Sequence, residues 1–217
     1  MKKLGLIHTS ATLVPIFAEL CAAKLPGVET FNIADDSLIK EVIATGRLTS
    51  SVSRRVAAHV VAADEAGADQ ILVTCSSIGA AVERAAGLVD TPVLRVDQPM
   101  ADQAVATGKR IGVAATLPTT LGPTADLIRR RAEAAGREIE LDAQLCEGAF
   151  EALMSGDAER HDKMVAEALV RLAKDNDVVV LAQASMARVV AQLDAETTKT
   201  PILSSPALAI DALANQG

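Results

Sequence analysis

Residues 68–82 read ADQILVTCSSIGAAV, and residues 176–190 read NDVVVLAQASMARVV. Each segment places a short, uniformly apolar run before a polar turn. A run of this kind is typical of a strand in a parallel sheet that is covered on both faces, and the turn marks the strand's carboxyl end. The two segments also resemble each other, which indicates that the chain contains one structural unit twice.

Two further pairs of segments support the duplication. KKLGLIHTSAT at 2–12 resembles KRIGVAATLPT at 109–119, and TPVLRVDQPMADQAV at 91–105 resembles TPILSSPALAIDAL at 200–213. The spacings agree, because 70 residues separate Gly5 from Cys75 and 71 separate Gly112 from Gln183. We expect an N-terminal lobe at 1–107 and a C-terminal lobe at 108–217, with the last helix free to pack back on the first lobe. The alternative is that any two α/β halves share a strand, turn and helix pattern.

Apolar runs too short for helices alternate with longer amphipathic stretches along the whole chain. The fold class expected is therefore α/β, with two pseudo-symmetric lobes of mainly parallel sheet flanked by helices. Ligands of open parallel sheets bind beyond the carboxyl ends of the strands, so we expect an active-site cleft between the lobes. The predicted strands are Lys3–His8, Val28–Asn32, Gln70–Thr74, Val93–Val96, Arg110–Ala114, Ile139–Leu145, Val178–Leu181 and Ile202–Ser204. The clearest predicted helices are Leu13–Lys24, Ser53–Ala66, Thr124–Ala135 and Lys163–Lys174.

Composition excludes several classes of function. Half of the 217 residues are hydrophobic, which is enough for a sizeable core, and 23% are charged. The net charge of −7 and the absence of Trp and Tyr argue against a nucleic-acid partner. No apolar window is long enough for a membrane span or a secretory signal. We expect a cytoplasmic protein, and its Ala-rich helix faces suit a homodimer.

The residues best placed for chemistry follow the predicted strands. Cys75 lies between a strand and a helix, where backbone N–H groups and the helix dipole lower the pKa of a thiol. His8 ends the first strand, where an imidazole facing the cleft could act as acid or base. Hydroxyl and amide groups in the same loops suit a substrate carboxylate. The candidate binding residues are Thr9, Ser10, Thr12, Ser76, Ser77, Thr116, Thr119, Thr120, Gln183, Ala184 and Ser185. Ordinary helix capping is the alternative explanation for several of them.

The remaining cysteines and histidines have other expected roles. Cys21 and Cys146 indicate core packing, although Cys146 lies near the end of a strand. His59 is expected on a helix surface or at an interface, and His161 on a solvated helix surface. Dinucleotide, phosphate-loop, zinc-protease and serine-hydrolase motifs are absent from the sequence, so we expect no metal and no cofactor.

The sequence resembles the aspartate/glutamate racemase superfamily, which includes hydantoin racemases, maleate isomerases and arylmalonate decarboxylases. The resemblance rests on the first strand with its polar turn, VTCSSIG at 73–79, IGVAAT at 111–116 and VVVLAQASM at 178–186. It implies two α/β lobes, no cofactor, and two cysteines, one from each lobe. In the family's racemases these cysteines remove and return a proton beside a carboxylate.

The second cysteine is missing from this chain. Cys75 matches the first-lobe cysteine, but Gln183 stands where the family commonly has L-G-C-T or L-G-C-A. An amide is neither an acid nor a base near neutral pH. We expect an isomerase or racemase-like enzyme that uses Cys75 with another base, His8. Three alternatives stay open: a decarboxylase in which Cys75 protonates an enediolate, addition of the thiolate to an electrophilic carbon, and a non-catalytic protein that binds a small carboxylate.

Overall fold

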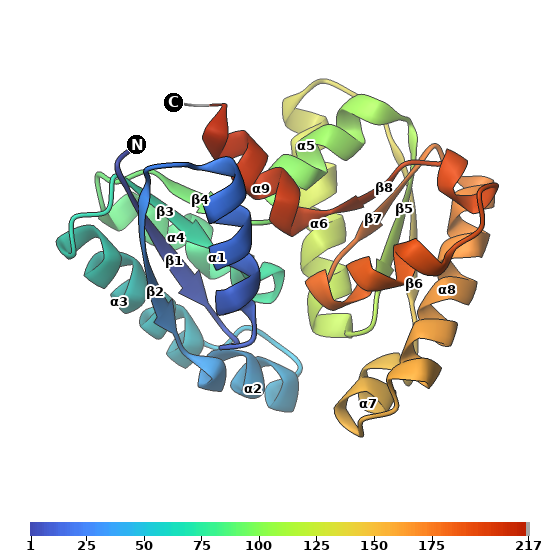
Figure 1. Cartoon of the computed structure of the whole chain (residues 1–217), viewed down its shortest axis with the longest axis horizontal. Helices are drawn as coiled ribbons and strands as arrows, with labels where there is room; N and C mark the ends of the chain where they lie inside the picture. The colour runs from blue at the N-terminus through green and yellow to red at the C-terminus, as the bar shows by residue number, and fades with distance from the viewer. Residues whose placement is uncertain (216–217) are drawn as a thin grey trace. The chain divides into compact units, whose positions relative to one another are not determined.

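The structure is a computed structural model that describes residues 1–215, and it consists of two compact units. The first unit contains residues 1–98 and the last helix, and the second contains residues 99–205. Each unit has one sheet of four parallel strands with helices against it (Figure 1). This confirms the predicted α/β class. Within the described residues, no helix is long and apolar enough to cross a membrane.

The sheet of the first unit has the order β2-β1-β3-β4. Its strands are β1 (Lys3–His8), β2 (Glu29–Ala34), β3 (Gln70–Val73) and β4 (Val93–Arg95). Its helices are α1 (Leu13–Lys24), α2 (Asp36–Thr45), α3 (Ser50–Glu65), α4 (Gly79–Ala85) and α9 (Ser205–Ala214), with short 3₁₀ turns η1 (Ser76–Ile78) and η2 (Ala86–Leu88).

The second sheet has the matching order β6-β5-β7-β8. Its strands are β5 (Arg110–Ala115), β6 (Glu140–Leu145), β7 (Val178–Leu181) and β8 (Ile202–Ser204). The helices are α5 (Gln98–Thr107), α6 (Pro118–Ala134), α7 (Ala149–Met154) and α8 (Ala158–Asp175), with 3₁₀ segments η3 (Ala184–Gln192) and η4 (Thr197–Lys199).

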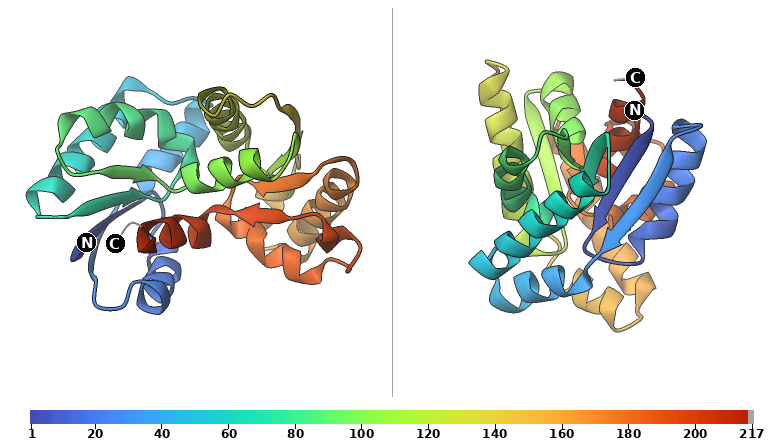
Figure 2. Two further views of the ribbon diagram at one scale, coloured as in Figure 1. Left: turned by 90° about the horizontal axis from the view of Figure 1, so that it is seen from above. Right: turned by 90° about the vertical axis from the view of Figure 1, so that its left-hand side faces the viewer.

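Alternation along β1 explains how the first sheet is covered on both faces. Ile7 packs in the core shared with α2, α3 and α4, whereas Leu4 and Leu6 pack in the core shared with α1 and α9. Side chains of a strand alternate between faces, so one short apolar strand supplies both cores. The right-hand view of Figure 2 shows α1 and α3 on opposite faces of this sheet.

The two units share a pattern of hydrogen bonds as well as a strand order. The Asp69 carboxylate accepts bonds from the backbone amides of residues 2–3 at 2.6 and 2.9 Å. The Asp177 carboxylate does the same for the amides of residues 109–110 at 3.0 and 2.8 Å. In both units an aspartate before the third strand therefore holds the start of the first strand, which supports a duplicated unit.

The division into units differs from the predicted lobes at one helix, α5, whereas the position of α9 is one that the prediction allowed. α5 joins the second unit, because Arg131 of α6 pairs with Asp102 and the Arg137 guanidinium donates to the Ala106 carbonyl. α9 packs with the first unit, where Leu213 joins the core around α1. The first unit therefore ends at residue 98, earlier than the predicted boundary between residues 107 and 108.

Gly5 offers a direct test of the packing between β1 and α3. A Cβ on Gly5 would lie 2.9 Å from Cζ of Phe31 and 3.4 Å from the Cβ atoms of Ala63 and Ala68. We expect Gly5→Ala to lower the free energy of unfolding by about 1–3 kcal/mol, because the core must move to admit it. Urea denaturation measures the change. Gly87→Ala is the matched control, since nothing lies within 4 Å of that site and its stability should not fall. Equal losses in the two variants would contradict the assigned packing.

Candidate active site

The carboxyl edge of the first sheet gathers the predicted residues of the first unit. β1 and β3 are neighbours, with Ile7 opposite Val73 in the parallel register. The chain leaves β1 into Thr9 and Ser10 and leaves β3 into Thr74 and Cys75. Thr9, Ser76 and Ser77 are buried, whereas Ser10 is partly exposed and bonds to the Thr12 hydroxyl at 2.8 Å. The parallel register therefore places a thiol and several hydroxyls along one edge.

Cys75 is the partly exposed thiol of this edge. It precedes η1 in extended backbone conformation, and its sulfur is hydrogen-bonded by the Thr9 hydroxyl and by the amides of Ser77 and Ile78. Burial among protein atoms raises the pKa of the Cys75 thiol, and the nearby Asp97 carboxylate raises it further. The three hydrogen bonds lower it, but burial outweighs them. The amides of the adjacent turn do lower the pKa of Cys75, as expected, but the net shift is upward because burial outweighs them, and the resting group at neutral pH is the thiol.

His8 lies in the interior of the first unit rather than at an open surface. It is fully buried, its ring centroid is 5.6 Å from that of Phe17, and its nitrogens bond to Thr74 Oγ1 at 2.8 Å and Asn32 Oδ1 at 2.9 Å. A neutral ring donates from Nε2 to Asn32 and accepts at Nδ1 when the Thr74 hydroxyl turns its one proton to the ring rather than to the Ile7 carbonyl, 3.2 Å away. Burial lowers the pKa of His8 and keeps the ring neutral. Neither nitrogen can exchange a proton with a substrate unless one of these bonds breaks.

Gln183 bonds to the equivalent edge of the second unit. Its Oε1 accepts from the Thr116 amide at 2.6 Å, and its Nε2 donates to the Thr116 hydroxyl at 2.8 Å. The Thr116 and Thr120 side chains are buried, and Thr119 Oγ1 is a buried hydroxyl without a hydrogen-bond partner. The bidentate contact fixes the orientation of the Gln183 amide. Ala184 is partly exposed and Ser185 exposed at the start of η3.

Sequence reasoning missed a charged cluster at the end of β2. Asp35 caps α2 by accepting from the Ser37 amide, and it also binds the Arg55 guanidinium at 2.5 Å and His59 Nε2 at 2.9 Å. Burial opposes ionisation of Asp35, yet hydrogen bonds from Ser37, His59 and Arg55 outweigh it and hold its pKa well below the usual range. His59 is thus a partly exposed hydrogen-bond partner of Asp35. The only sequence signal was the cap-like pattern ADDSLIK at 34–40.

His161 corrects a second expectation. It was predicted on a solvated helix surface, but it is fully buried near the start of α8. Its Nδ1 lies 2.7 Å from Asp162 Oδ1, and Arg188 donates to the same carboxylate oxygen at 2.7 Å. Its Nε2 is buried with no hydrogen-bond partner. The inward face of α8 continues through Val165 and Leu169, so His161 belongs to its apolar side.

Cys21 and Cys146 are core residues, in agreement with their favoured interpretation. Both are buried, and burial raises the pKa of Cys21 and raises that of Cys146 to about 11. Among the described residues, no group of His, Cys, Asp and Glu side chains could hold a metal ion.

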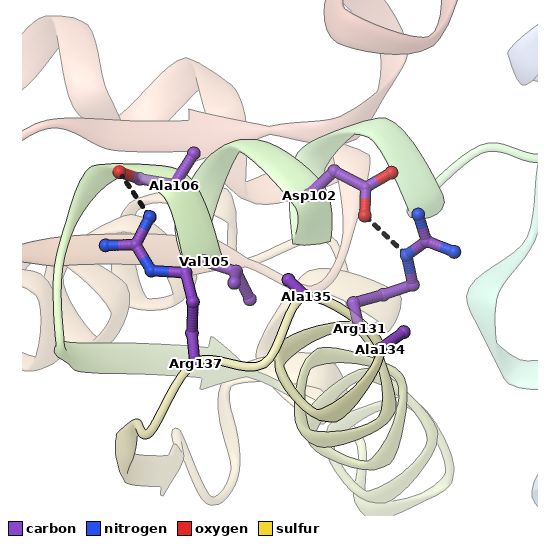
Figure 3. Close-up of a pocket in the computed structure, with 7 residues that line it drawn as sticks. All are labelled: Asp102, Val105, Ala106, Arg131, Ala134, Ala135 and Arg137. Atoms are coloured by element: carbon purple, nitrogen blue, oxygen red, sulfur yellow. Dashed lines mark hydrogen bonds and ion pairs between the residues drawn. The ribbon is translucent and has the colours of Figure 1, made fainter.

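A pocket in the second unit is lined by none of the candidate site residues. It measures about 270 Å³ and is lined by Val105 and Ala106 before β5 and by Ala134, Ala135 and Arg137 before β6, together with the Asp102–Arg131 ion pair (Figure 3). These positions precede the amino ends of the strands. Ligands of parallel sheets bind at the opposite ends, so this pocket is not the candidate active site.

The three thiols should differ sharply in reactivity. In native protein at pH 8, we expect a chromogenic disulfide reagent to titrate one thiol per chain, at Cys75, because Cys21 and Cys146 are buried. The reaction should be slower than that of a free thiol, since the Cys75 pKa is raised. After denaturation all three should react. Peptide mass spectrometry identifies the site, and rapid labelling of Cys21 or Cys146 would contradict the assignment.

Comparisons with known proteins agree with this architecture. A putative Asp/Glu racemase from Yersinia pestis has a TM-score of 0.75 at 20% identity, with coverage of 100% of this chain and 99% of the other. The Picrophilus torridus aspartate racemase gives 0.70 at 14% identity (99% and 95% covered), and the Klebsiella pneumoniae allantoin racemase gives 0.69 at 17% (100% and 87% covered). No curated protein matches the sequence. The family described as Asp/Glu/Hydantoin racemase matches residues 4–213, and the chain belongs to that family.

Proposed function

We propose that the protein is a racemase-like isomerase that moves a proton on the carbon next to a carboxylate of a small substrate, with Cys75 as the proton-transferring group. Membership of a racemase family supports the reaction class. The observation that carries the proposal is the position of Cys75. It is a partly exposed thiol at the carboxyl end of β3 that receives hydrogen bonds from Thr9, Ser77 and Ile78.

Charge that develops on the substrate requires stabilisation at the same edge. Removing the proton spreads negative charge onto the carboxylate oxygens, and hydroxyls and backbone amides stabilise such oxygens without a cation. Ser10, which is partly exposed beside Thr12, and the start of η1 supply groups of this kind.

Two-thiol racemisation is not part of the proposal. Gln183 replaces the second thiol, and both ends of its amide bond to Thr116. A positioned acid or base is worth about 10²–10⁴-fold in rate, which corresponds to roughly 3–5 kcal/mol of barrier. His8 does not supply this group, because both of its nitrogens are occupied. We assign His8 the role of holding Thr74 in place.

Decarboxylation is the second candidate, and the protonation state of Cys75 favours it. Loss of carbon dioxide from a substrate with two carboxylates on one carbon leaves an enediolate, which needs one proton and no base. A thiol that stays protonated at neutral pH is suited to donate that proton. The Cys75 thiolate then regains a proton from water.

Isotope exchange distinguishes the candidates. In deuterated water, an isomerase should introduce deuterium at the α-carbon of recovered substrate, whereas a decarboxylase should give product labelled once and release carbon dioxide. We suggest both enantiomers of aspartate, glutamate and allantoin, together with small malonates, as the substrates to be tested by NMR. Activity on any of them should fall at least about 10²-fold in Cys75→Ser, because serine is a far weaker acid.

Cys21→Ala is the matched control, since Cys21 is a buried thiol of the same unit and its loss should leave turnover intact. A Cys75→Ser variant with undiminished turnover would contradict the proposal. If the wild type shows no turnover and both proteins bind a small carboxylate equally in calorimetry, the protein is a non-catalytic binding protein and the proposal fails.

The pH dependence of the rate tests whether Cys75 acts as acid or base. If the thiol donates the proton, kcat should be level through neutral pH and fall as pH rises past the Cys75 pKa, which lies above the ordinary value of about 8.5. If the thiolate removes the proton, kcat should rise with pH toward the same midpoint. A profile without a Cys75-dependent midpoint would contradict both assignments.

A further inference from the structure

A buried ion pair lies against the segment that follows Cys75. Arg95, at the end of β4, donates from Nε to Asp97 Oδ1 at 3.0 Å and from one terminal nitrogen to Asp97 Oδ2 at 2.8 Å. Its other terminal nitrogen donates to Glu83 of α4 at 2.5 Å. The Arg95 side chain is 4% exposed and that of Asp97 is 1% exposed. β4, α4 and the Asp97 connection are thereby joined through one guanidinium.

Gly79 makes room for this guanidinium. A Cβ on Gly79 would lie 2.1 Å from Arg95 Cζ and 2.5 Å or less from two of its nitrogens, so no larger residue fits without displacing Arg95. Gly79 begins α4 and directly follows η1, whose amides bond to the Cys75 sulfur. The Arg95 guanidinium is therefore packed against the turn that orients those amides.

The second copy of the repeat lacks all parts of this arrangement. Where the first copy has Cys75 and Gly79, the second has Gln183 and Ala187. In the matching segments at 91–105 and 200–213, Ser204 aligns with Arg95 and Pro206 with Asp97. The ion pair and the glycine that admits it thus occur only in the copy that has the thiol.

Stability alone does not explain the ion pair. Removing two charges from water costs about as much as their attraction returns, and apolar residues of similar size often stabilise a core as well or better. The second copy folds with the same strand order and without such a pair. The role of the ion pair is therefore connected with the thiol, which the first copy has and the second copy lacks.

We propose that Arg95 and Asp97 are positioning residues for Cys75. The ion pair holds the turn at 76–79 so that the amides of Ser77 and Ile78 stay directed at the sulfur, and its two opposite charges set the ease with which the thiol ionises. The inference rests on the proposed function only in taking Cys75 as the reacting group. It assigns neither residue a contact with substrate.

Other charged groups around the segment are paired among themselves. Asp97 is a carboxylate that acts on Cys75, and Glu83 accepts a hydrogen bond from Arg95. From α2 and α3, which contact η1, Glu41 and Arg55 pair with each other, and Arg55 and His59 both bind Asp35. On β1, His8 is buried and neutral. A change of charge at the Arg95–Asp97 pair should therefore change how readily the Cys75 thiol ionises.

The pH dependence of Cys75 alkylation tests the proposal without any substrate. The rate with iodoacetamide follows the thiolate fraction, and peptide mass spectrometry separates Cys75 from the buried cysteines. Asp97→Asn removes the negative charge, so the midpoint should fall. Below the midpoint each unit of fall should raise the rate about threefold, since the more acidic thiolate is a weaker nucleophile. Arg95→Gln leaves Asp97 uncompensated, so the midpoint should rise.

We expect the alkylation midpoints of Asp97→Asn and Arg95→Gln to shift in opposite directions. A merely structural role would make both variants less stable without separating their midpoints. Arg95→Lys should restore much of the wild-type midpoint, and Gly79→Ala, which displaces Arg95, should weaken the amide contacts and raise it. Arg131→Gln is the control, since it breaks the Arg131–Asp102 ion pair of the second unit and should leave the midpoint unchanged. Thermal unfolding confirms that each variant is folded.

If the two core variants do not fold, Glu83→Gln replaces them, because the Glu83 side chain is 37% exposed and its loss keeps the Arg95–Asp97 pair. Its midpoint should fall. Midpoints that stay at the wild-type value, or that move in the same direction for Asp97→Asn and Arg95→Gln, would overturn the proposal. Opposite midpoint shifts in a protein that exchanges no deuterium into any carboxylate would instead refute only the proposed function.

Discussion

The parallel register between the first and third strands of each unit decides where chemistry can occur. The amide of Thr74 donates to the Ile7 carbonyl at 2.9 Å, and in the second unit the amide of Ala182 donates to the Ala114 carbonyl at 2.9 Å. These bonds extend each strand pair by one residue and align the two chains as they leave the sheet. Thr9 then reaches Cys75, and Thr116 reaches Gln183. A slip of one residue would turn these side chains toward the opposite face.

The two units keep the same main-chain frame and differ in the groups attached to it. The edge that holds His8 and Thr74 in the first unit has Ala115 and Ala182 in the second. Removing an imidazole and a hydroxyl together leaves no buried polar group unpaired, so the substitution costs little. The position of Cys75 is likewise taken by Gln183 in the second unit, whose amide finds two partners on Thr116. At these matched positions the polar side chains of each unit have hydrogen-bond partners, and only the first unit has an ionisable group at the position of Cys75.

Sequence reasoning found the frame because strand pattern and repeat spacing are local properties. β1, β7, β8 and α1 begin and end at the predicted residues, and the two sheets share one strand order. It did not find features that depend on distant contacts. These features are the burial of His161, the Asp35 cluster and the Arg95–Asp97 pair. Each depends on how the helices pack on the sheets. The identity of a polar residue in an amphipathic stretch does not reveal that packing. The direction of the Cys75 pKa was missed for the same reason, since burial outweighs the amides of the adjacent turn.

A single ionisable group constrains the stereochemistry of the proposed reaction. Two thiols on opposite faces of a carbon interconvert mirror images, because one removes the proton and the other returns it. In the proposed reaction, a single thiol exchanges protons on one face of the carbon only, since the Gln183 amide, which is bound to Thr116, is neither an acid nor a base. Protonation of a planar enediolate from one face gives a product of one configuration. If the substrate arrives with a second carboxylate on that carbon, replacing the thiol by Gln183 favours formation of one enantiomer, whereas the racemase-like candidate needs a second proton-transferring group besides Cys75.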